Sequence, residues 1–344
     1  MKTYAKHVGL AALLLFALLL FFMPGAQAQE ASPSPCMPDA ETLEAYRADG
    51  TLAERQAYYE SLSLNQTDPG LIAQAQARES GSASLRAVPS GWKSGMATTG
   101  NARILLIRVD FPDYSFSEDD TEDALKQIAF GAAGEDQPGY PYESLSAYYE
   151  RSSYGQLHIS GQVASYKAVN NRDTYSRNMA SLFKEAMTAL DAQGMDFSQF
   201  DGNADGLMDG VYIHFAGPNT GWGSHWWSYK ASYEGAPFAL DGVALSDYVT
   251  LHDNSAYGAR TLIHETGHML GLADYYSYTA QTYENGIRTF DMMCDNTGDH
   301  NGFSKWLLGW IKQEDITRVS GARLRGARAR VCPREPRSAP GHQA

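Results

Sequence analysis

Cysteine is scarce in this chain of 344 residues, which has only Cys36, Cys294 and Cys332. A count this small, and odd, excludes the disulfide-built scaffold of many small secreted proteins. The fold must therefore be held together by packing and by bound ions. With 43% hydrophobic residues, the chain can form one large core or two modest ones.

Positive charge is also in short supply. Lysine and arginine number 27 against 40 aspartates and glutamates, which gives a formal net charge of -13. A nucleic-acid backbone or an anionic membrane surface would repel such a protein. We therefore expect neither nucleic acid nor a membrane among the partners of the mature protein.

Long apolar runs are absent after the N-terminus. The single such run, "LAALLLFALLLFF", follows two lysines and precedes a Pro-Gly break and the small-residue site Ala26-Gln27-Ala28. This order is typical of a secretory signal peptide, so we expect residues 1–28 to be removed and the protein to be secreted. The alternative is a retained membrane anchor, but the run is short for a span of about 20 residues.

Changes in composition divide the remaining chain into three parts. Residues 29–100 are polar, with helix-like pieces and a Gly/Ser stretch, and are predicted to form a removable, propeptide-like segment. Residues 101–317 are predicted to form the main domain. From Arg318 onward, seven arginines and one glutamate give a net charge of +6. Residues 318–344 are therefore expected to be a basic, disordered tail; a sequence error or shifted reading frame is the other interpretation.

Within the main domain, apolar spacing predicts alternating strands and helices. Strands are expected in "ILLIRVDF", "QLHISGQVASY" and "GVYIHFAG". Helices are expected in "EDALKQIAF", "SLSAYYERSSYG" and "SLFKEAMTALDAQ". This order predicts an α/β or α+β domain built around a central twisted sheet.

The stretch "TLIHETGHMLGLADYY" carries the strongest chemical signal. Residues four apart lie on one face of a helix, so His264 and His268 can offer two imidazole nitrogens to one zinc ion. Glu265 then lies beside the metal rather than pointing at it. This position suits a general base that takes a proton from zinc-bound water, whose pKa the metal lowers to about 7.

A third ligand is needed, and Asp274 is predicted to supply it. Gly271 is suited to end the helix in a left-handed conformation and return the chain beneath the metal. The whole pattern is then H-E-x-x-H-x-x-G-x-x-D. Glu284 and His225 are the alternative ligands. The alternative to a metal site is an ordinary surface or core helix that carries histidines.

Downstream, "FDMMCDNTGDH" offers Met292 and Met293 for the tight methionine turn that lies under the zinc ligands of metzincins. Methionine pairs also serve simply as core filler.

The stretch "FDGNADGLMDGVY" predicts a site for a hard cation. Oxygen-bearing side chains occupy positions 1, 3, 5 and 9 of a loop, spaced to wrap calcium: Asp201, Asn203, Asp205 and Asp209. Gly206 stands at position 6, but position 12 is Tyr212 instead of the bidentate glutamate of an EF-hand. The alternative is a solvated acidic turn.

Together these motifs resemble the M6 family of secreted zinc metallopeptidases, the immune inhibitor A group. The resemblance runs from about Asn101 to about Lys312 and includes "ILLIRVDFPD", "YYERSSYGQLHISGQV", "MDFSQFDGNADGLMDGVYIHFAG", "GSHWW", the zinc motif and "SKWLLGW". It implies a metzincin-like fold and cleavage inside protein substrates. It also implies functional residues: zinc on His264, His268 and Asp274, Glu265 as general base, a Met-turn at Met293, and calcium near Asp201 to Asp209.

Two departures from the family pattern affect these expectations. The chain ends soon after the Met-turn region, where larger relatives carry further domains, so accessory modules are expected to be absent. Asn203 replaces an aspartate that is common in the family, which is expected to weaken calcium binding without abolishing it.

The leading hypothesis is thus an exported zinc endopeptidase made as a zymogen. A catalytically inactive binding protein on the same scaffold is a second hypothesis, although such descendants usually lose a ligand or the glutamate. Another zinc amidohydrolase, such as a deacetylase, is a third. Because the same general base would serve any amide, only the family resemblance favours protein substrates.

Latency has two candidate explanations in the sequence. "SPCMPDAE" places Cys36 in a Cys-x-Pro-Asp motif that resembles the cysteine switch of unrelated metzincin zymogens, where a thiolate occupies the open zinc position. The other explanation is steric covering of the cleft by residues 29–100. In that case Cys36 is incidental, or is the disulfide partner of Cys294 or Cys332.

Overall fold

The computed structural model describes residues 38–80, 96–132, 143–176, 178–252, 259–279, 286–296 and 298–312. The expected signal peptide and the basic tail lie outside these residues. So do Cys36, Cys332 and the alternative zinc ligand Glu284.

A five-stranded sheet with the order β2-β1-β3-β7-β4 forms the centre of the protein. Its strands are β1 (Gly100–Asp110), β2 (Leu157–Lys167), β3 (Gly210–Phe215), β4 (Tyr229–Ser232) and β7 (Asp247–His252). All neighbouring pairs are parallel except β4 and β7, which are antiparallel. A separate small hairpin joins β5 (Ala239–Leu240) to β6 (Val243–Ala244).

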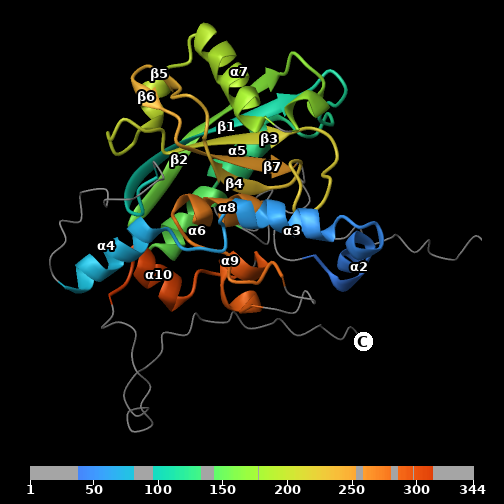
Figure 1. Cartoon of the computed structure of the whole chain (residues 1–344). Coiled ribbons are helices and arrows are strands. Elements are labelled where there is room, and N and C mark those ends of the chain that lie inside the picture. Colours follow the sequence, from blue (N-terminus) through green and yellow to red (C-terminus); the bar gives the residue numbers. More distant parts are fainter. Residues whose placement is uncertain are drawn as a thin grey trace, which may run out of the picture.

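Helices cover both faces of this sheet. Successive side chains of a strand point to opposite faces, which explains why the centre of β1, Ile104 to Ile107, is apolar without a break. Leu105 and Ile107 face the core that contains α7 (Met179–Ala192). Ile104 and Leu106 face the opposite core. The opposite core contains α5 (Glu122–Phe130), α6 (Leu145–Ser152) and α8 (Arg260–Met269). Figure 1 shows α7 on the upper side of the sheet and α6 and α8 on the lower side. The predicted mixed architecture with a central sheet is confirmed.

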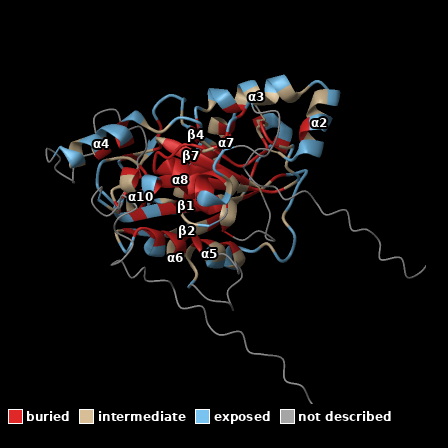
Figure 2. Ribbon diagram, turned by 90° about the horizontal axis from the view of Figure 1, so that it is seen from below, coloured by how far each residue is buried: buried red, intermediate tan, exposed pale blue. Residues whose placement is uncertain are grey.

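The N-terminal segment, residues 38–80, packs against this body as three helices: α2 (Ala40–Ala48), α3 (Leu52–Ser61) and α4 (Pro69–Glu79). Their outer faces are exposed, whereas the sheet and α8 are buried (Figure 2). Tyr59 of α3 and Leu71 of α4 are completely buried. Arg78 donates hydrogen bonds to the carbonyls of Trp306 and Leu307 in α10 (Gly302–Leu308). The segment is therefore attached to the main body by buried side chains and by hydrogen bonds to α10.

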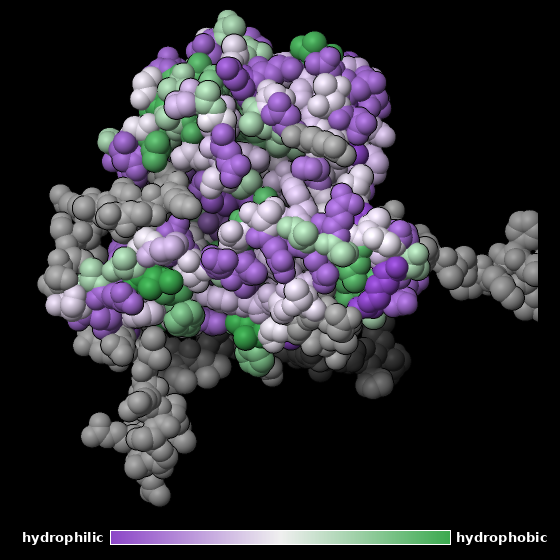
Figure 3. All heavy atoms as spheres, in the orientation of Figure 1, coloured by the Kyte–Doolittle hydropathy of each residue, from purple (hydrophilic) through white to green (hydrophobic). Residues whose placement is uncertain are grey.

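Short elements complete the described chain: η1 (Arg172–Tyr175), η2 (Phe197–Phe200), η4 (Arg288–Phe290) and α9 (Met292–Asp295). On the face drawn in Figure 3, the described surface is mostly hydrophilic or neutral, and apolar residues form small separate spots. Among the described residues, no helix combines the length and apolar character needed to cross a bilayer.

Candidate metal centre

Helix α8 presents the histidines from inside the core. Its apolar residues Leu262, Ile263 and Met269 pack beneath the sheet. The helix ends at Met269, and Gly271 follows with φ of +90°. Because a left-handed residue reverses the chain at a helix end, this glycine turns the backbone toward Asp274. The predicted role of Gly271 is confirmed.

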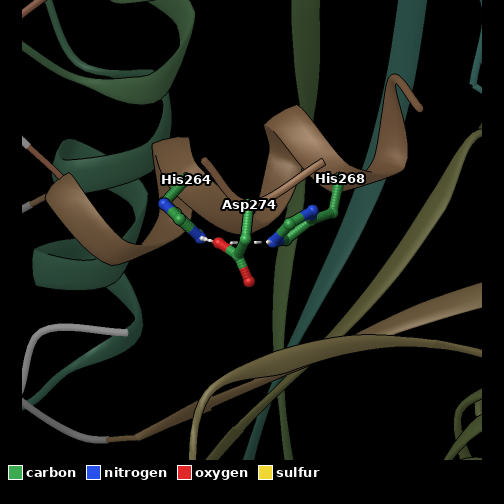
Figure 4. Close-up of side chains that lie close together, drawn as sticks. All are labelled: His264, His268 and Asp274. Atoms are coloured by element: carbon green, nitrogen blue, oxygen red, sulfur yellow. Dashed lines mark ion pairs between the residues drawn. The ribbon is translucent and has the colours of Figure 1, made fainter. Parts of the chain in front are cut away.

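The three predicted ligands meet at one point. The Nε2 atom of His264 lies 3.0 Å from Oδ1 of Asp274, and Nε2 of His268 lies 3.4 Å from the same oxygen. Figure 4 shows both imidazoles pointing at this carboxylate. In the described part of the chain, this is the one group of three or more His, Cys, Asp or Glu side chains placed to hold a metal ion, with ligand atoms within 4.8 Å of one another.

Hydrogen bonding leaves these three atoms without partners. Nε2 of His264, Nε2 of His268 and Oδ1 of Asp274 are buried and make no hydrogen bond of acceptable geometry. The other ring nitrogen of each histidine faces a backbone carbonyl. Nδ1 of His264 lies 3.1 Å from the Met292 carbonyl oxygen, and Nδ1 of His268 lies 2.8 Å from the Leu272 carbonyl oxygen. Because a carbonyl only accepts, each Nδ1 carries the proton and each Nε2 keeps its lone pair. Two imidazole nitrogens and a carboxylate oxygen are a donor set compatible with zinc.

The electrostatics of the buried group follow from these contacts. Burial alone would raise the pKa of Asp274, but the two histidines outweigh it and lower that pKa to about 2. For His264, burial acts to lower the pKa, and the neighbouring Asp274 raises it above the ordinary value. The group thus favours an ionised carboxylate, which is the form that binds a metal.

Glu265 is completely buried next to this group without belonging to it. Burial raises its pKa to about 7, although His264 and His268 act in the opposite direction. Neither carboxyl oxygen makes a hydrogen bond of acceptable geometry. A carboxyl with a pKa near neutrality can both take up and release a proton at physiological pH.

The methionine segment lies directly against α8. A side chain at Gly267, between the two histidines, would clash with the Sδ atom of Met293, so this glycine allows close packing. The backbone N–H of Met293 donates to Asp291, and the Met292 carbonyl is the one that orients His264. The sequence pattern indicated the methionines but not Asp291, whose only local signal is its place directly before them.

Two further contacts to Asp274 were also missed. The Tyr278 hydroxyl donates to Oδ2 of Asp274 over 2.6 Å, and the Asp274 backbone N–H donates to the Leu64 carbonyl over 2.7 Å. A tyrosine four residues after a ligand is a weak signal, and Leu64 gives none. The alternative ligand His225 packs on the ring of Tyr58 and is not part of the metal-binding group.

A hollow of about 820 Å³ lies beside His268. Residues from Tyr58 to Pro69 form one wall, and Lys230 to Ser232 of β4 form another. The start of α7, Tyr248 of β7 and Gly271 also contribute to the lining. The hollow therefore lies between the N-terminal segment and an edge strand of the central sheet.

The acidic loop lies between η2 and β3 and is held by hydrogen bonds to backbone N–H groups. Asp201 accepts hydrogen bonds from the backbone N–H groups of Asp205 and Gly206. Asp209 is fully buried, and its Oδ2 accepts from the N–H groups of Arg103 and Gly202. Its Oδ1 has no hydrogen-bond partner, and burial raises the pKa of this carboxyl to about 7. Within the described residues, the carboxylates of this loop are not gathered as closely as the ligand atoms of His264, His268 and Asp274.

A search against protein-family models finds no match for the chain. The chain is similar to Immune inhibitor A of Bacillus thuringiensis subsp. alesti, with 27% identity over 234 residues. The similar region covers 54% of this chain and 33% of that relative, so the match spans about a third of the relative's length. This partial similarity agrees with the resemblance carried by the motifs and suggests a related family.

Proposed function

We propose that the protein is a secreted zinc endopeptidase that cleaves peptide bonds within proteins and is made as a zymogen. The observation that carries the proposal is the buried set of Nε2 of His264, Nε2 of His268 and Oδ1 of Asp274, with Glu265 beside it. Burial of three such polar atoms without partners is costly unless a cation binds them. The similarity to Immune inhibitor A supports the same family of functions.

In this proposal each residue has a separate role. His264, His268 and Asp274 hold the metal, and Met293 supports them from below α8. Zinc bound there would act as a Lewis acid and lower the pKa of its water ligand to about 7. Glu265, buried beside the metal-binding group, would accept a proton from the attacking water and deliver it to the leaving amine.

Protein substrates are favoured by the position of β4. This strand pairs with β7 and forms an edge of the sheet, and three of its residues line the hollow beside His268. Extended peptides bind such edges by adding a strand, because backbone hydrogen bonds are formed whatever the peptide's sequence. A small acetylated or amidated substrate would gain nothing from this edge.

The direct test is activity on casein with and without a chelator, measured after the N-terminal segment has been released. We expect phenanthroline to abolish cleavage and added zinc to restore it. Cleavage that continues after complete removal of zinc would contradict the proposal, and zinc binding without any cleavage would favour an inactive binding protein.

Latency is proposed to come from covering by the N-terminal segment. The site residues are almost completely inaccessible, with exposures of 0% for His264 and Glu265, 4% for His268 and 5% for Asp274. The ring of Tyr59 packs on Trp222 and Tyr278, with ring centres 4.9 and 5.0 Å apart. A polypeptide cannot reach a site this closed, so residues 38–80 must move before catalysis. The position of Cys36 outside the described residues leaves its switch role a prediction.

We therefore expect cleavage between α4 and β1 to activate the protein. A recognition site for a specific protease is placed within residues 81–95, and peptidase activity is measured before and after cutting and removal of the N-terminal fragment. An increase on the order of tenfold or more is expected, because a site that is mostly closed lowers apparent activity by its open fraction. The Glu265→Gln precursor, cut in the same way, controls for the added protease. Equal activity before and after release would contradict the covering role.

We also propose that the acidic loop binds calcium. Calcium at about 100 times its Kd is expected to stabilise the fold by about 2.7 kcal/mol, because it binds the native state in preference to the unfolded state. Asp205→Ala should remove this effect. Asp191→Ala, which deletes a carboxylate on α7 outside the loop, should keep it. A wild-type melting temperature that does not respond to calcium would reduce the loop to an acidic turn.

A further inference from the structure

The two oxygens of the Asp274 carboxylate have different partners. Oδ1 faces Nε2 of both histidines, whereas Oδ2 accepts a hydrogen bond of 2.6 Å from the Tyr278 hydroxyl. Tyr278 is buried, with 2% exposure, so water does not compete for this bond. A phenol is protonated at neutral pH and therefore acts as the donor.

We infer that Tyr278 is a positioning residue that fixes Asp274 as a one-oxygen ligand. A carboxylate can offer a metal one oxygen or both, and a donor on the second oxygen favours the first arrangement. One-oxygen binding leaves a coordination position open for water or substrate, as a catalytic zinc site requires. This inference rests on the proposed zinc site, but it concerns a residue that does not touch the metal.

Contacts from distant parts of the chain hold Tyr278 in this orientation. The Gln56 side chain donates to the Tyr278 carbonyl over 2.8 Å. The rings of Tyr59 and Trp222 meet the Tyr278 ring edge-on, with centres 5.0 and 6.0 Å away. Tyr276 adds a third neighbouring ring, with its centre 5.5 Å from that of Tyr278. The ring is thus enclosed on several sides, and its hydroxyl is directed at Asp274 rather than at solvent.

The N-terminal segment contributes to the same arrangement. Its Leu64 carbonyl binds the Asp274 backbone N–H, and the Asp68 N–H binds the Gly271 carbonyl over 2.9 Å. These two bonds bracket the loop between His268 and Asp274. Residues 38–80 therefore hold both the backbone of the third ligand and the tyrosine that orients its side chain.

The test compares zinc binding by Tyr278→Phe and Tyr149→Phe in the full chain. Tyr149 is a matched control because its fully buried hydroxyl also donates a hydrogen bond, to the Ile263 carbonyl of α8 over 2.8 Å. Tyr278→Phe is expected to raise the zinc Kd by about 10- to 100-fold, as loss of a partner behind a metal ligand does. Tyr149→Phe is expected to lower thermal stability while keeping the wild-type Kd, measured by competition with a chelator.

Cobalt substitution gives a readout that a structural role alone would not change. In Tyr278→Phe, Asp274 is free to bind through both oxygens, so the visible absorption of bound Co²⁺ should weaken as the ion moves from four- to five-coordination. The phenylalanine ring keeps its packing, and circular dichroism checks the fold. If part of the variant unfolds, the cobalt spectrum of the folded fraction still shows whether the coordination of the ion has changed.

Wild-type zinc affinity and an unchanged cobalt spectrum in Tyr278→Phe would overturn the inference. An equal loss of zinc affinity in Tyr149→Phe would also overturn it, since the effect would then be one of general stability. A wild-type chain that binds no metal would overturn it as well. A wild-type chain that binds zinc with this tyrosine dependence but cleaves no protein after release of its N-terminal segment would instead contradict only the proposed endopeptidase function.

Discussion

Glu265→Gln is expected to keep its zinc and to lose peptidase turnover by about 10²- to 10⁴-fold, the contribution typical of a general acid–base residue. Glutamine fills the same buried space but cannot take up the proton. Glu265 does not belong to the group His264, His268 and Asp274, so the metal should remain. Zinc content is measured by elemental analysis, and turnover is measured on casein with the N-terminal segment released.

Glu118→Gln provides the matched control, because it makes the same chemical change at an exposed position. It should retain both zinc and activity. If Glu265→Gln lost zinc, Glu265 would be a ligand and the assignment of roles would be wrong. If it kept full turnover, the proton would have to be carried by another group.

Asp274→Ala is expected to weaken zinc binding by more than about 100-fold, beyond the range for residues that only support a ligand. It removes the one carboxylate of the metal-binding group, leaving two neutral imidazoles. Alanine keeps the backbone N–H that bonds to Leu64, so the contact with the N-terminal segment should survive. Titration against a chelator of known zinc affinity measures the change.

Glu284→Ala tests the alternative ligand in the same titration and should bind zinc normally. Normal affinity in Asp274→Ala together with reduced affinity in Glu284→Ala would transfer the third ligand to Glu284. Because the Tyr278→Phe effect is expected to be smaller than that of Asp274→Ala, the order of the three variants also tests the separation between ligand and positioning residue.

Much of the candidate site was predictable because its signals are local. Four-residue spacing on one helix places His264 and His268 on the same face, whatever surrounds that helix. The need for a left-handed residue after a helix explains Gly271, and a short connection limits how far Asp274 can lie from the histidines. The apolar run of β1 predicts a strand buried on both faces, and the strand is found as expected.

The N-terminal segment, residues 29–100, was predicted to be a removable piece because of its polar composition and its Gly/Ser stretch. The tertiary structure, and not the sequence, shows that Tyr59 is buried against Tyr278, the residue that binds Asp274. Amphipathic spacing shows that a helix buries one face, but it does not show what that face covers.

The sequence by itself determined the side chains of the candidate site: two imidazoles, a carboxylate and a nearby glutamate are placed by helical spacing and one turn. Tertiary structure alone decided what orients and encloses them. Gln56 and Tyr278 are 222 residues apart in the chain yet share a hydrogen bond, and Leu64 binds the backbone of Asp274. Contacts between such distant residues depend on how α3 and the loop after it pack onto the domain, and no local pattern encodes that packing.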